Sequence, residues 1–471
     1  MPKHDATIIK QCLVIGLGRI GLPQALSLAQ SGIQVYGFDH QIETVDMLQR
    51  GMTPFYEPSM QEYLRETQGK SFFPYASWQE LHSFLPEMDA ILFTVGTQAP
   101  TQKDILNNTK FDLQAYFTLL DHLFSSQIQL KKGVKLIIRT TLPLGSTDLL
   151  KHYLENTHGL EEGHDFYLAF VPERVTEGFM IDELKTIPKI IGVYSDAAFE
   201  PIRKLFAQKK EQVLRVRNPI TAEFCKLTDN SYRSTIFSYA NDIAMRASEL
   251  DVDIKEVIDV VNDHYDRNHI PQPGFVSGYC LSKDPYIFEL DFLKSEKKRD
   301  FHSVWYYGRK TNDYLIDFVA AKTCAHLNNN PNACVALLGL SFKENVDDFR
   351  LSHAFKLMEK LHAQGIQHFN VYDPYFNQNK YTTIPEEFLP YIHQSSTILA
   401  PQIFEHVDAI IVSTCHQAIL EVDTIDKLTP LLAKTHQPCY LFDGWGCWEQ
   451  AAHIKHIQYE RIGYNPGKTT V

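Results

Sequence analysis

Cys280 stands in a segment whose residue types and spacing can support nucleophilic chemistry. The segment runs Pro271-Gln-Pro-Gly-Phe-Val-Ser-Gly-Tyr-Cys280, and Lys283 and Asp284 follow three and four residues later. Glycine lets backbone approach a ligand closely, and a neighbouring ammonium favours the thiolate, the nucleophilic form of cysteine. Most cysteines are small buried hydrophobes, so this thiol becomes a catalytic candidate only together with a second signal.

A glycine-rich turn near the start of the chain supplies that second signal. The stretch Cys12-Leu-Val-Ile-Gly16-Leu-Gly18-Arg-Ile-Gly21 reads as an apolar strand that runs into G-x-G-x-x-G, with a helix expected over 22–31. A second strand is expected at 34–39 and ends at Asp39. The glycines permit close approach of a pyrophosphate, and Asp39 can accept hydrogen bonds from ribose hydroxyls. The pattern predicts an NAD site, and with the thiol it suggests an oxidation through a covalent intermediate.

The elements that must position these residues fall into three sections. Strands at 89–95, 134–140 and 166–172 alternate with helical segments and predict a doubly wound parallel sheet. A helical section follows from about 199 to 265. Within it Lys226 and Asn230 are i,i+4 neighbours that can point at one site, unless they lie on a solvated helix face.

The last section repeats the first. A strand at 333–338 leads into Gly339-Leu-Ser-Phe-Lys343, and 361–373 parallels 28–39 down to a terminal aspartate. Lys343 replaces the dinucleotide pattern and suits a phosphate as a point charge, so we expect a second nucleotide-type ligand and not a second NAD. The alternative is a surface lysine on a structural domain. Strands at 407–413 and 439–443 are expected to complete this sheet.

Composition sets the class of protein. The chain has 471 residues, 44% hydrophobic content and a net charge of -12, which indicates a globular protein of two or three domains and argues against general nucleic-acid binding. We find no run of about 18 apolar residues and no signal-peptide pattern, so no membrane partner is expected. Eight scattered cysteines without a CxxC pair give no support for a metal site, and reduced cytoplasmic thiols are expected.

The chain resembles the UDP-glucose/GDP-mannose dehydrogenase family of nucleotide-sugar 6-dehydrogenases, nearest the UDP-N-acetylhexosamine branch. Six blocks in order carry the resemblance: Gly16–Pro23, Thr140–Gly145, Pro172–Gly178, Ala222–Asn230, Gly278–Asp284 and Gly339–Arg350. The resemblance implies two Rossmann-type doubly wound parallel-sheet domains joined by a central helical domain, an α/β fold. The expected domains are 1–198 for NAD, 199–318 for the catalytic cysteine and dimer interface, and 319–471 for the UDP-sugar.

The resemblance also implies residue roles in an NAD-dependent four-electron oxidation of a sugar C6 alcohol to a carboxylate. Cys280 matches the nucleophile that forms a thiohemiacetal and then a thioester, and Glu173 is the favoured acid/base for hydrolysis. The implied catalytic residues are Cys280, Lys226, Asn230, Asp284, Glu173, Glu177 and Thr141. The cofactor-binding residues are Gly16, Gly18, Arg19, Ile20, Gly21, Asp39, Thr97, Thr141, Lys283 and Arg350. The substrate-binding residues are Glu173, Arg174, Val175, Lys226, Asn230, Arg267, Gly278 and Lys343, with Arg267 reaching a partner subunit of a homodimer or higher homo-oligomer.

Several departures from the family pattern leave the substrate open. The loop contains Ser277 and Tyr279 where the family usually has more glycine. Arg19 replaces a common aromatic residue, and Trp445 stands where a phosphate-binding arginine is common. A UDP-N-acetylhexosamine is favoured, with UDP-glucose as the alternative. Two other readings are a dehydrogenase that removes one hydride, with Cys280 structural, and a catalytically silent nucleotide-sugar-binding protein.

Overall fold

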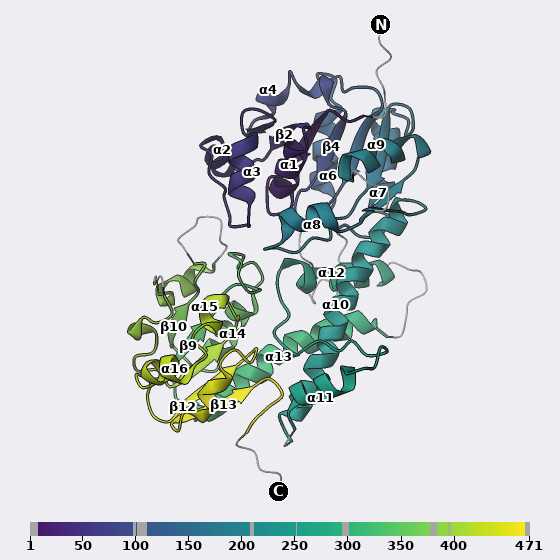
Figure 1. Cartoon of the computed structure of the whole chain (residues 1–471). Coiled ribbons are helices and arrows are strands. Elements are labelled where there is room, and N and C mark those ends of the chain that lie inside the picture. Colours follow the sequence, from purple (N-terminus) through teal and green to yellow (C-terminus); the bar gives the residue numbers. More distant parts are fainter. Residues whose placement is uncertain are drawn as a thin grey trace. The chain divides into compact units, whose positions relative to one another are not determined.

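The computed structural model describes residues 8–97, 100, 111–207, 212–250, 252–293, 301–376, 384–393, 395 and 397–466. The chain divides into two compact units, Met1–Asp229 with Leu290–Lys297 and Asn230–Glu289 with Lys298–Val471. The long helix α10 (Pro219–Ala247) and the helix α12 (Tyr279–Leu293) each contribute to both units (Figure 1). Within the described part of the chain, no helix is long and apolar enough to cross a membrane.

The first unit is built on a sheet whose described strands follow the order β3-β2-β1-β4-β5-β6-β7-β8. The strands are β1 (Gln11–Ile15), β2 (Gln34–Phe38), β3 (Phe72–Tyr75), β4 (Ala90–Phe93), β5 (Val134–Ile138), β6 (Phe166–Phe170), β7 (Lys189–Val193) and β8 (Val213–Arg215). The order from β3 to β6 is that of a dinucleotide-binding fold. Its reversal between β1 and β4 marks the switch point where such folds hold their ligand.

Helices cover both faces of this sheet. Successive side chains of β1 point to opposite faces, and the side chains on both faces are apolar and must be buried. Cys12 and Val14 belong to one apolar core, and Leu13 and Ile15 belong to the other. The helices are α1 (Gly21–Gln30), α2 (Ile42–Gln49), α3 (Met60–Thr67), α4 (Trp78–Leu81), α6 (Gln114–Leu123), α7 (Ser146–His158), α8 (Met180–Thr186) and α9 (Asp196–Phe206), with the 3-10 helix η1 (Leu85–Glu87).

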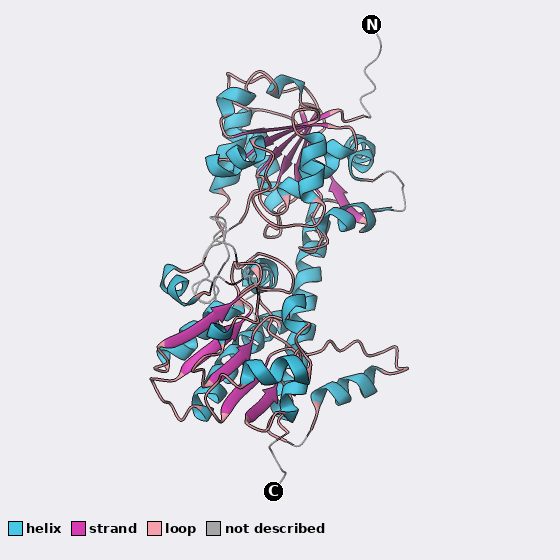
Figure 2. Ribbon diagram, turned by 60° about the vertical axis from the view of Figure 1, so that its left-hand side comes forward, coloured by secondary structure: helices cyan, strands magenta, loops and turns pink. Residues whose placement is uncertain are grey.

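The second unit has a parallel sheet of described strands in the order β10-β9-β11-β12-β13, drawn in magenta in Figure 2. These strands are β9 (Cys334–Leu338), β10 (His368–Tyr372), β11 (Ala409–Val412), β12 (Cys439–Asp443) and β13 (Ile457–Arg461). The helices are α11 (Ile254–Asn262), α13 (Val304–His326), α14 (His353–Ala363), α15 (Gln417–Leu420) and α16 (Ile425–Leu432), with η3 (Glu386–Tyr391), η4 (Pro401–Ile403) and η5 (Glu449–His453). Apolar side chains of α11 and α13 share one core with β9, so part of the central helical section belongs to this sheet.

The predicted α/β class with two doubly wound sheets is confirmed, and three details of the prediction are wrong. Strand β7 runs antiparallel to β6, so the first sheet is not wholly parallel. Strand β8 interrupts the section expected to be helical. Strand β13 follows 439–443, which was expected to complete the second sheet. Its sequence, Ile-Gln-Tyr-Glu-Arg, has no apolar run that would predict a buried strand. Glu460 can nevertheless be buried there, because its carboxylate is paired with Lys322 and accepts a hydrogen bond from the Tyr440 hydroxyl.

Candidate active site

The glycine loop of the first unit lies at the switch point between β1 and β4. A Cβ atom at Gly21 would lie 1.8 Å from the Gly16 carbonyl oxygen, whereas a Cβ at Gly18 would meet nothing within 4 Å. The Asp39 carboxylate accepts a hydrogen bond of 2.7 Å from the Leu17 backbone N–H and so ties the loop to the end of β2. The loop is therefore closed on the Gly21 side and open at Gly18. This shape fits the close approach of a dinucleotide pyrophosphate.

Arg19 and Glu177, predicted for different roles, form an ion pair in the structure. The Arg19 Nη1 atom lies 3.4 Å from Glu177 Oε2, and the guanidinium lies 4.8 Å from the centre of the Phe55 ring. Their side chains are 11% and 16% exposed, so the pair is largely shielded from water. Glu177 is thus held beside the glycine loop, and Arg19 packs on Phe55.

The other residues predicted for the cofactor side lie around the same edge of the first sheet. Ile20 immediately precedes α1, and the Thr97 hydroxyl donates a 3.4 Å hydrogen bond to the Thr141 carbonyl oxygen. This bond connects the segment after β4 to the segment after β5. Thr97 and Thr141 are both nearly buried. Lys283 and Arg350, also predicted to bind the cofactor, belong to the second unit.

Glu173 is the centre of a buried charge cluster that extends beyond the predicted residues. Its Oε1 atom accepts hydrogen bonds from the backbone N–H groups of Arg174, at 2.7 Å, and Val175, at 3.2 Å. Its Oε2 atom is paired with the buried Arg139 guanidinium, and the Lys189 ammonium lies 3.6 Å from Oε1. Burial alone would raise the pKa of Glu173, but the charges of Arg139 and Lys189 outweigh it and lower the pKa. These contacts favour the ionised carboxylate.

Lys226 lies near this cluster on α10, and its side chain is 7% exposed. Its charge adds a smaller contribution to the lowered pKa of Glu173, after burial and the larger effects of Arg139 and Lys189. Asp229, three residues further along α10, accepts a 3.2 Å hydrogen bond from Arg174. The structure thus associates Lys226 and Glu173, which come from separate sequence blocks.

Glu223, in the same block as Lys226, was not predicted as a functional residue. Its carboxylate accepts hydrogen bonds from the backbone N–H groups of Gly145, at 2.7 Å, and Thr147, at 2.8 Å. These donors lie at the start of α7, where backbone N–H groups lack helical partners. Burial raises the pKa of Glu223 to about 7. Glu223 therefore joins α10 to the Thr140–Gly145 block, and no spacing rule in the sequence identifies such a long-range cap.

The predicted thiol site is assembled in the second unit. Cys280 is exposed in the first turn of α12, where the helix N-terminus stabilises negative charge on sulfur. The Asp284 carboxylate accepts a 2.6 Å hydrogen bond from Lys283 and a 2.5 Å hydrogen bond from the Asn230 amide. Burial alone would lower the pKa of Lys283, but the charges of Asp284 and Cys280 outweigh it and raise the pKa. Asp284 thus positions an ammonium that interacts with Cys280.

Gly278 places the thiol turn against the loop that follows β9. Its φ is +84°, and a Cβ atom there would lie 2.3 Å from the Phe342 ring. The next residue, Tyr279, contacts two of the predicted cofactor residues, with Lys283 at 5.1 Å and Arg350 at 4.9 Å from its ring centre. Tyr279, one of the departures from the family loop, therefore packs with two cations.

Ser277, the other departure from the family loop, is held by a buried histidine. Its hydroxyl lies 2.7 Å from His353 Nδ1, and His353 Nε2 lies 2.9 Å from the Ser413 carbonyl oxygen. Burial lowers the pKa of His353 to about 4, so the imidazole is neutral and can make both bonds. Ser277 thus links the thiol loop to the end of β11.

Lys343 lies at the switch point of the second sheet, between β9 and β11. Its side chain is 16% exposed, and its ammonium lies 3.8 Å from a Glu344 carboxylate oxygen. Asp373, at the end of β10, accepts hydrogen bonds from the backbone N–H groups of Leu340, at 2.6 Å, and Ser341, at 3.0 Å. In the second unit Asp373 thus binds the loop after β9 in the way that Asp39 binds the glycine loop of the first unit. The loop after β9, however, contains Lys343, whereas the glycine loop has the open position at Gly18.

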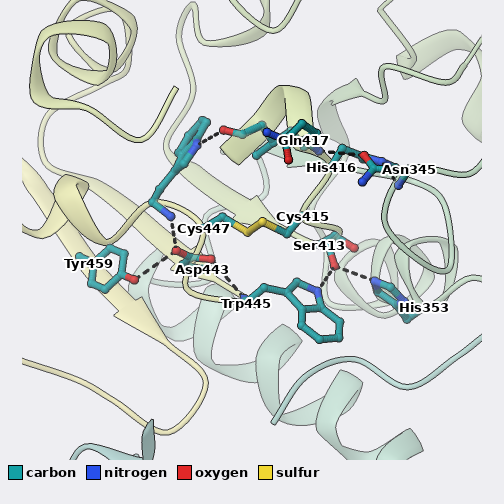
Figure 3. Close-up of a disulfide and its surroundings, with 12 residues drawn as sticks. Asn345, His353, Ser413, Cys415, His416, Gln417, Asp443, Trp445, Cys447 and Tyr459 are labelled. Carbon is teal, nitrogen blue, oxygen red and sulfur yellow. Dashed lines mark hydrogen bonds between the residues drawn. A yellow bond between two sulfur atoms is a disulfide. The ribbon is translucent and has the colours of Figure 1, made fainter. Parts of the chain in front are cut away.

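A disulfide between Cys415 and Cys447 joins the loops after β11 and β12 (Figure 3). Trp445 lies in the same loop as Cys447, and its indole N–H donates a 2.8 Å hydrogen bond to the Ser413 carbonyl oxygen. The expectation of eight reduced thiols is wrong at these two positions. No sequence motif predicts this pair. The two cysteines are 32 residues apart in sequence and come together because the strands that precede them, β11 and β12, are neighbours in the sheet.

Two remaining predictions concern Arg267 and metals. Arg267 lies in the exposed segment after α11, 5.8 Å from the Tyr265 ring centre, and within the described part of the chain it forms no hydrogen bond or ion pair with the site residues above. Among the described residues, no group of three or more histidine, cysteine, aspartate or glutamate side chains is arranged to hold a metal ion.

Comparisons with known proteins match every section of the chain. The NAD binding, central and UDP binding domains of the UDP-glucose/GDP-mannose dehydrogenase family match residues 10–210, 220–313 and 336–450. UDP-N-acetyl-D-mannosamine dehydrogenase of Pyrococcus horikoshii is 30% identical over 415 residues, 87% of this chain and 90% of that protein. NDP-N-acetyl-D-galactosaminuronic acid dehydrogenase of Ralstonia nicotianae is 29% identical over 428 residues, 88% of this chain and 92% of that protein. A solved structure of the Pyrococcus horikoshii UDP-D-ManNAc dehydrogenase matches with a TM-score of 0.79 at 28% identity, over 96% of this chain and 99% of that one.

Proposed function

The chain belongs to the UDP-glucose/GDP-mannose dehydrogenase family, and we propose that it oxidises the C6 alcohol of a UDP-N-acetylhexosamine to the uronic acid. It is an NAD-dependent oxidoreductase that converts a UDP-sugar to the corresponding acid. The single observation that carries the chemistry is the exposed Cys280 beside the buried Lys283–Asp284 pair. The N-acetylated sugar is supported by the names of the relatives, which act on N-acetylmannosamine and N-acetylgalactosamine derivatives.

The proposed mechanism gives each group of the chain one task. After the alcohol is oxidised to an aldehyde, the Cys280 thiolate adds to the carbonyl carbon and forms a thiohemiacetal. Oxidation of this adduct gives a thioester, and water then adds to it and expels the thiolate, which leaves the sugar acid. Lys226 and Asn230 would stabilise the oxyanion at each addition. When bound at the glycine loop, NAD accepts the hydride in each of the two oxidations.

Supporting roles are proposed for the carboxylates of the family block. Glu173 remains the proposed acid/base for thioester hydrolysis, with anchoring of the Arg174 and Val175 backbone as the alternative role. Glu177 would hold Arg19 at the cofactor, and Thr141 would contact the reacting groups. The domain division at residues 198 and 318 is retained as part of this proposal.

The test is an assay of the purified enzyme with NAD and a panel of nucleotide sugars. The panel contains UDP-N-acetylglucosamine, UDP-N-acetylmannosamine, UDP-glucose, UDP-galactose and GDP-mannose. We expect the highest kcat/KM with an N-acetylated UDP-sugar and two NADH formed for each sugar consumed. One NADH per sugar would leave Cys280 without a covalent role, and binding without NADH production would identify a silent binding protein.

We expect NAD to be strongly preferred over NADP. The Asp39 carboxylate is held at the end of β2 by the Leu17 and Gln41 N–H groups, and its negative charge would repel a 2′-phosphate. His40 and Gln41 follow it, so no arginine is adjacent to accept the phosphate. Steady-state kinetics with both cofactors measure the ratio, and equal turnover with NADP would contradict the assignment.

Lys343→Ala is expected to weaken UDP binding by about tenfold to a hundredfold and to leave NAD affinity unchanged. The estimate corresponds to the loss of one charge-assisted phosphate contact. Separate titrations with UDP and NAD measure both affinities. Lys360→Ala is the control, because it removes an exposed lysine of α14 that pairs with Asp317. If NAD binding collapses while UDP binding persists, the two ligand sites are assigned the wrong way round.

We also propose that the chain acts as a cytoplasmic homodimer or higher homo-oligomer. Tyr232 and Tyr239 lie seven residues apart on α10, with 58% and 56% of their surface exposed. This spacing places both rings on one helix face, which supports pairing through α10. The cytoplasmic location rests on the need for Cys280 to remain a free thiol. Sedimentation of the wild type and of a Tyr232→Ser, Tyr239→Ser variant tests the pairing.

A further inference from the structure

A cavity of about 490 Å³ is lined by residues of the first unit, between α1, α8 and the end of α9. The three helices are labelled in Figure 1. Gln24, Ser27 and Leu28 line it from α1, and Phe206 lines it from the end of α9. None of the described residues that line this cavity belongs to the glycine loop or to the predicted substrate residues. It is therefore distinct from the dinucleotide site described above.

The polar lining of this cavity is positively charged. Lys185, Lys189 and Lys204 line it, and the described lining residues include no aspartate or glutamate. Lys189 is 3% exposed, and its ammonium is paired with Glu173, whose Oε1 atom lies 3.6 Å away. Three lysines and no carboxylate among the described lining residues make the cavity favourable for an anion.

The remaining lining has the features needed to hold the body of a small polar ligand. The Gln24 side-chain oxygen is buried without a donor, and Gln24 as a whole is 3% exposed. It can accept a hydrogen bond from a ligand hydroxyl, to which the Ser27 hydroxyl can also bond. Leu28 and Phe206 provide apolar surface for carbon atoms. The combination of ammonium groups, an acceptor and apolar walls suits a phosphate monoester of a polyhydroxylated compound.

The cavity borders the Glu173 charge cluster. Lys189 lines the cavity and lies 3.6 Å from Glu173 Oε1. Arg139, which is paired with the other carboxylate oxygen of Glu173, stacks at 4.5 Å on the Phe206 ring. Two lining residues therefore contact the cluster. An anion in the cavity would compete with Glu173 for the Lys189 ammonium.

We propose that this cavity is a binding site for a small phosphate monoester, and that its ligand shares Lys189 with Glu173. A bound dianion attracts Lys189 and repels the Glu173 carboxylate, so binding makes ionised Glu173 less stable. The coupling is reciprocal, and loss of the Glu173 charge must strengthen anion binding by the same factor. The effect on catalysis rests on the proposed role of Glu173, whereas the binding site does not.

Calorimetric titration with glucose 6-phosphate, in the presence of saturating NAD and UDP, tests the site. Saturation occupies the two nucleotide sites, so remaining binding of one equivalent reports the new cavity. We expect Lys204→Gln to weaken this binding about tenfold, as for loss of one charged contact, with dehydrogenase activity unchanged. Lys70→Gln, which removes an exposed lysine in the turn before β3, is the matched control and should bind like the wild type.

Two further measurements decide the ligand and the coupling. Inorganic phosphate should bind more weakly than glucose 6-phosphate, and glucose should not bind, if both charge and hydroxyl groups are recognised. Glu173→Gln should tighten glucose 6-phosphate binding several-fold, because Lys189 loses its competing carboxylate. Absence of binding under saturating NAD and UDP, or equal affinity of Lys204→Gln and wild type, would overturn the site. Unchanged affinity of Glu173→Gln would overturn the coupling alone, and neither result affects the proposed dehydrogenase activity.

Discussion

Cys280→Ser is expected to abolish the complete oxidation, with NADH production falling by roughly a thousandfold or more. A serine hydroxyl stays protonated near neutral pH, whereas the exposed residue Cys280 lies at a helix N-terminus and interacts with the Lys283 ammonium. Neither the thiohemiacetal nor the thioester can then form at a useful rate. The measurement is NADH formed per UDP-sugar, followed spectroscopically to completion.

The control for this substitution is Cys334→Ser, at the start of β9. This cysteine is free and partly buried, and its thiol has no place in the proposed mechanism. It should retain wild-type turnover and two NADH per sugar. If Cys280→Ser also retains them, the covalent mechanism is excluded while the family assignment stands. Binding of NAD and UDP to Cys280→Ser should be unchanged, which separates loss of chemistry from loss of folding.

Gly21→Ala is expected to disrupt the cofactor loop, with NAD affinity falling at least tenfold and the first unit destabilised by about 1–3 kcal/mol. The new methyl group would lie 1.8 Å from the Gly16 carbonyl oxygen and 2.5 Å from the Thr94 hydroxyl. Backbone must move to accommodate it, because the closest contact is with a carbonyl oxygen and not with a flexible side chain. Titration with NAD and thermal unfolding measure the two effects.

Gly18→Ala provides the matched comparison within the same loop. Its methyl group would meet nothing within 4 Å, so stability should change by less than about 0.5 kcal/mol. NAD affinity should nevertheless fall, because the methyl group occupies the side from which the pyrophosphate approaches. Equal losses of stability in the two variants would show that the close approach of Gly21 to the Gly16 carbonyl oxygen does not limit which residue can stand at position 21. UDP binding should remain intact in both, since Lys343 lies in the other unit.

The elements with regular local patterns could be predicted from the sequence. The apolar runs at β1, β4, β5, β6, β9 and β11 are buried strands in the structure. The glycine loop was recognisable because its three glycines are close in sequence. Asp39 was recognisable because it follows the loop at the spacing of a strand–helix–strand unit. The same reasoning identified a repeat of this arrangement in the second unit, with Asp373 as its aspartate. Lys343 stands in its loop in place of the dinucleotide pattern, which is why a UDP-sugar and not a second NAD was expected there.

The elements that were missed lack such patterns. β13 contains a buried Glu460 whose partners, Lys322 and Tyr440, lie on α13 and β12. β8 has only three residues, too few for a periodicity. The reversed direction of β7 depends on the path of the preceding chain and not on the composition of the strand itself.

Residue types and their spacing were sufficient to predict the α/β class, the glycine loop, the thiol turn and the family. These features depend on local backbone geometry, which residue type and spacing encode directly. The pairing of side chains from distant segments becomes visible in the three-dimensional structure: Asn230 with Asp284, Glu173 with Arg139 and Lys189, and Cys415 with Cys447. Such pairs are set by which strands and helices become neighbours. The free energy of burying a charge then selects partners from separate segments, and no local pattern records that selection.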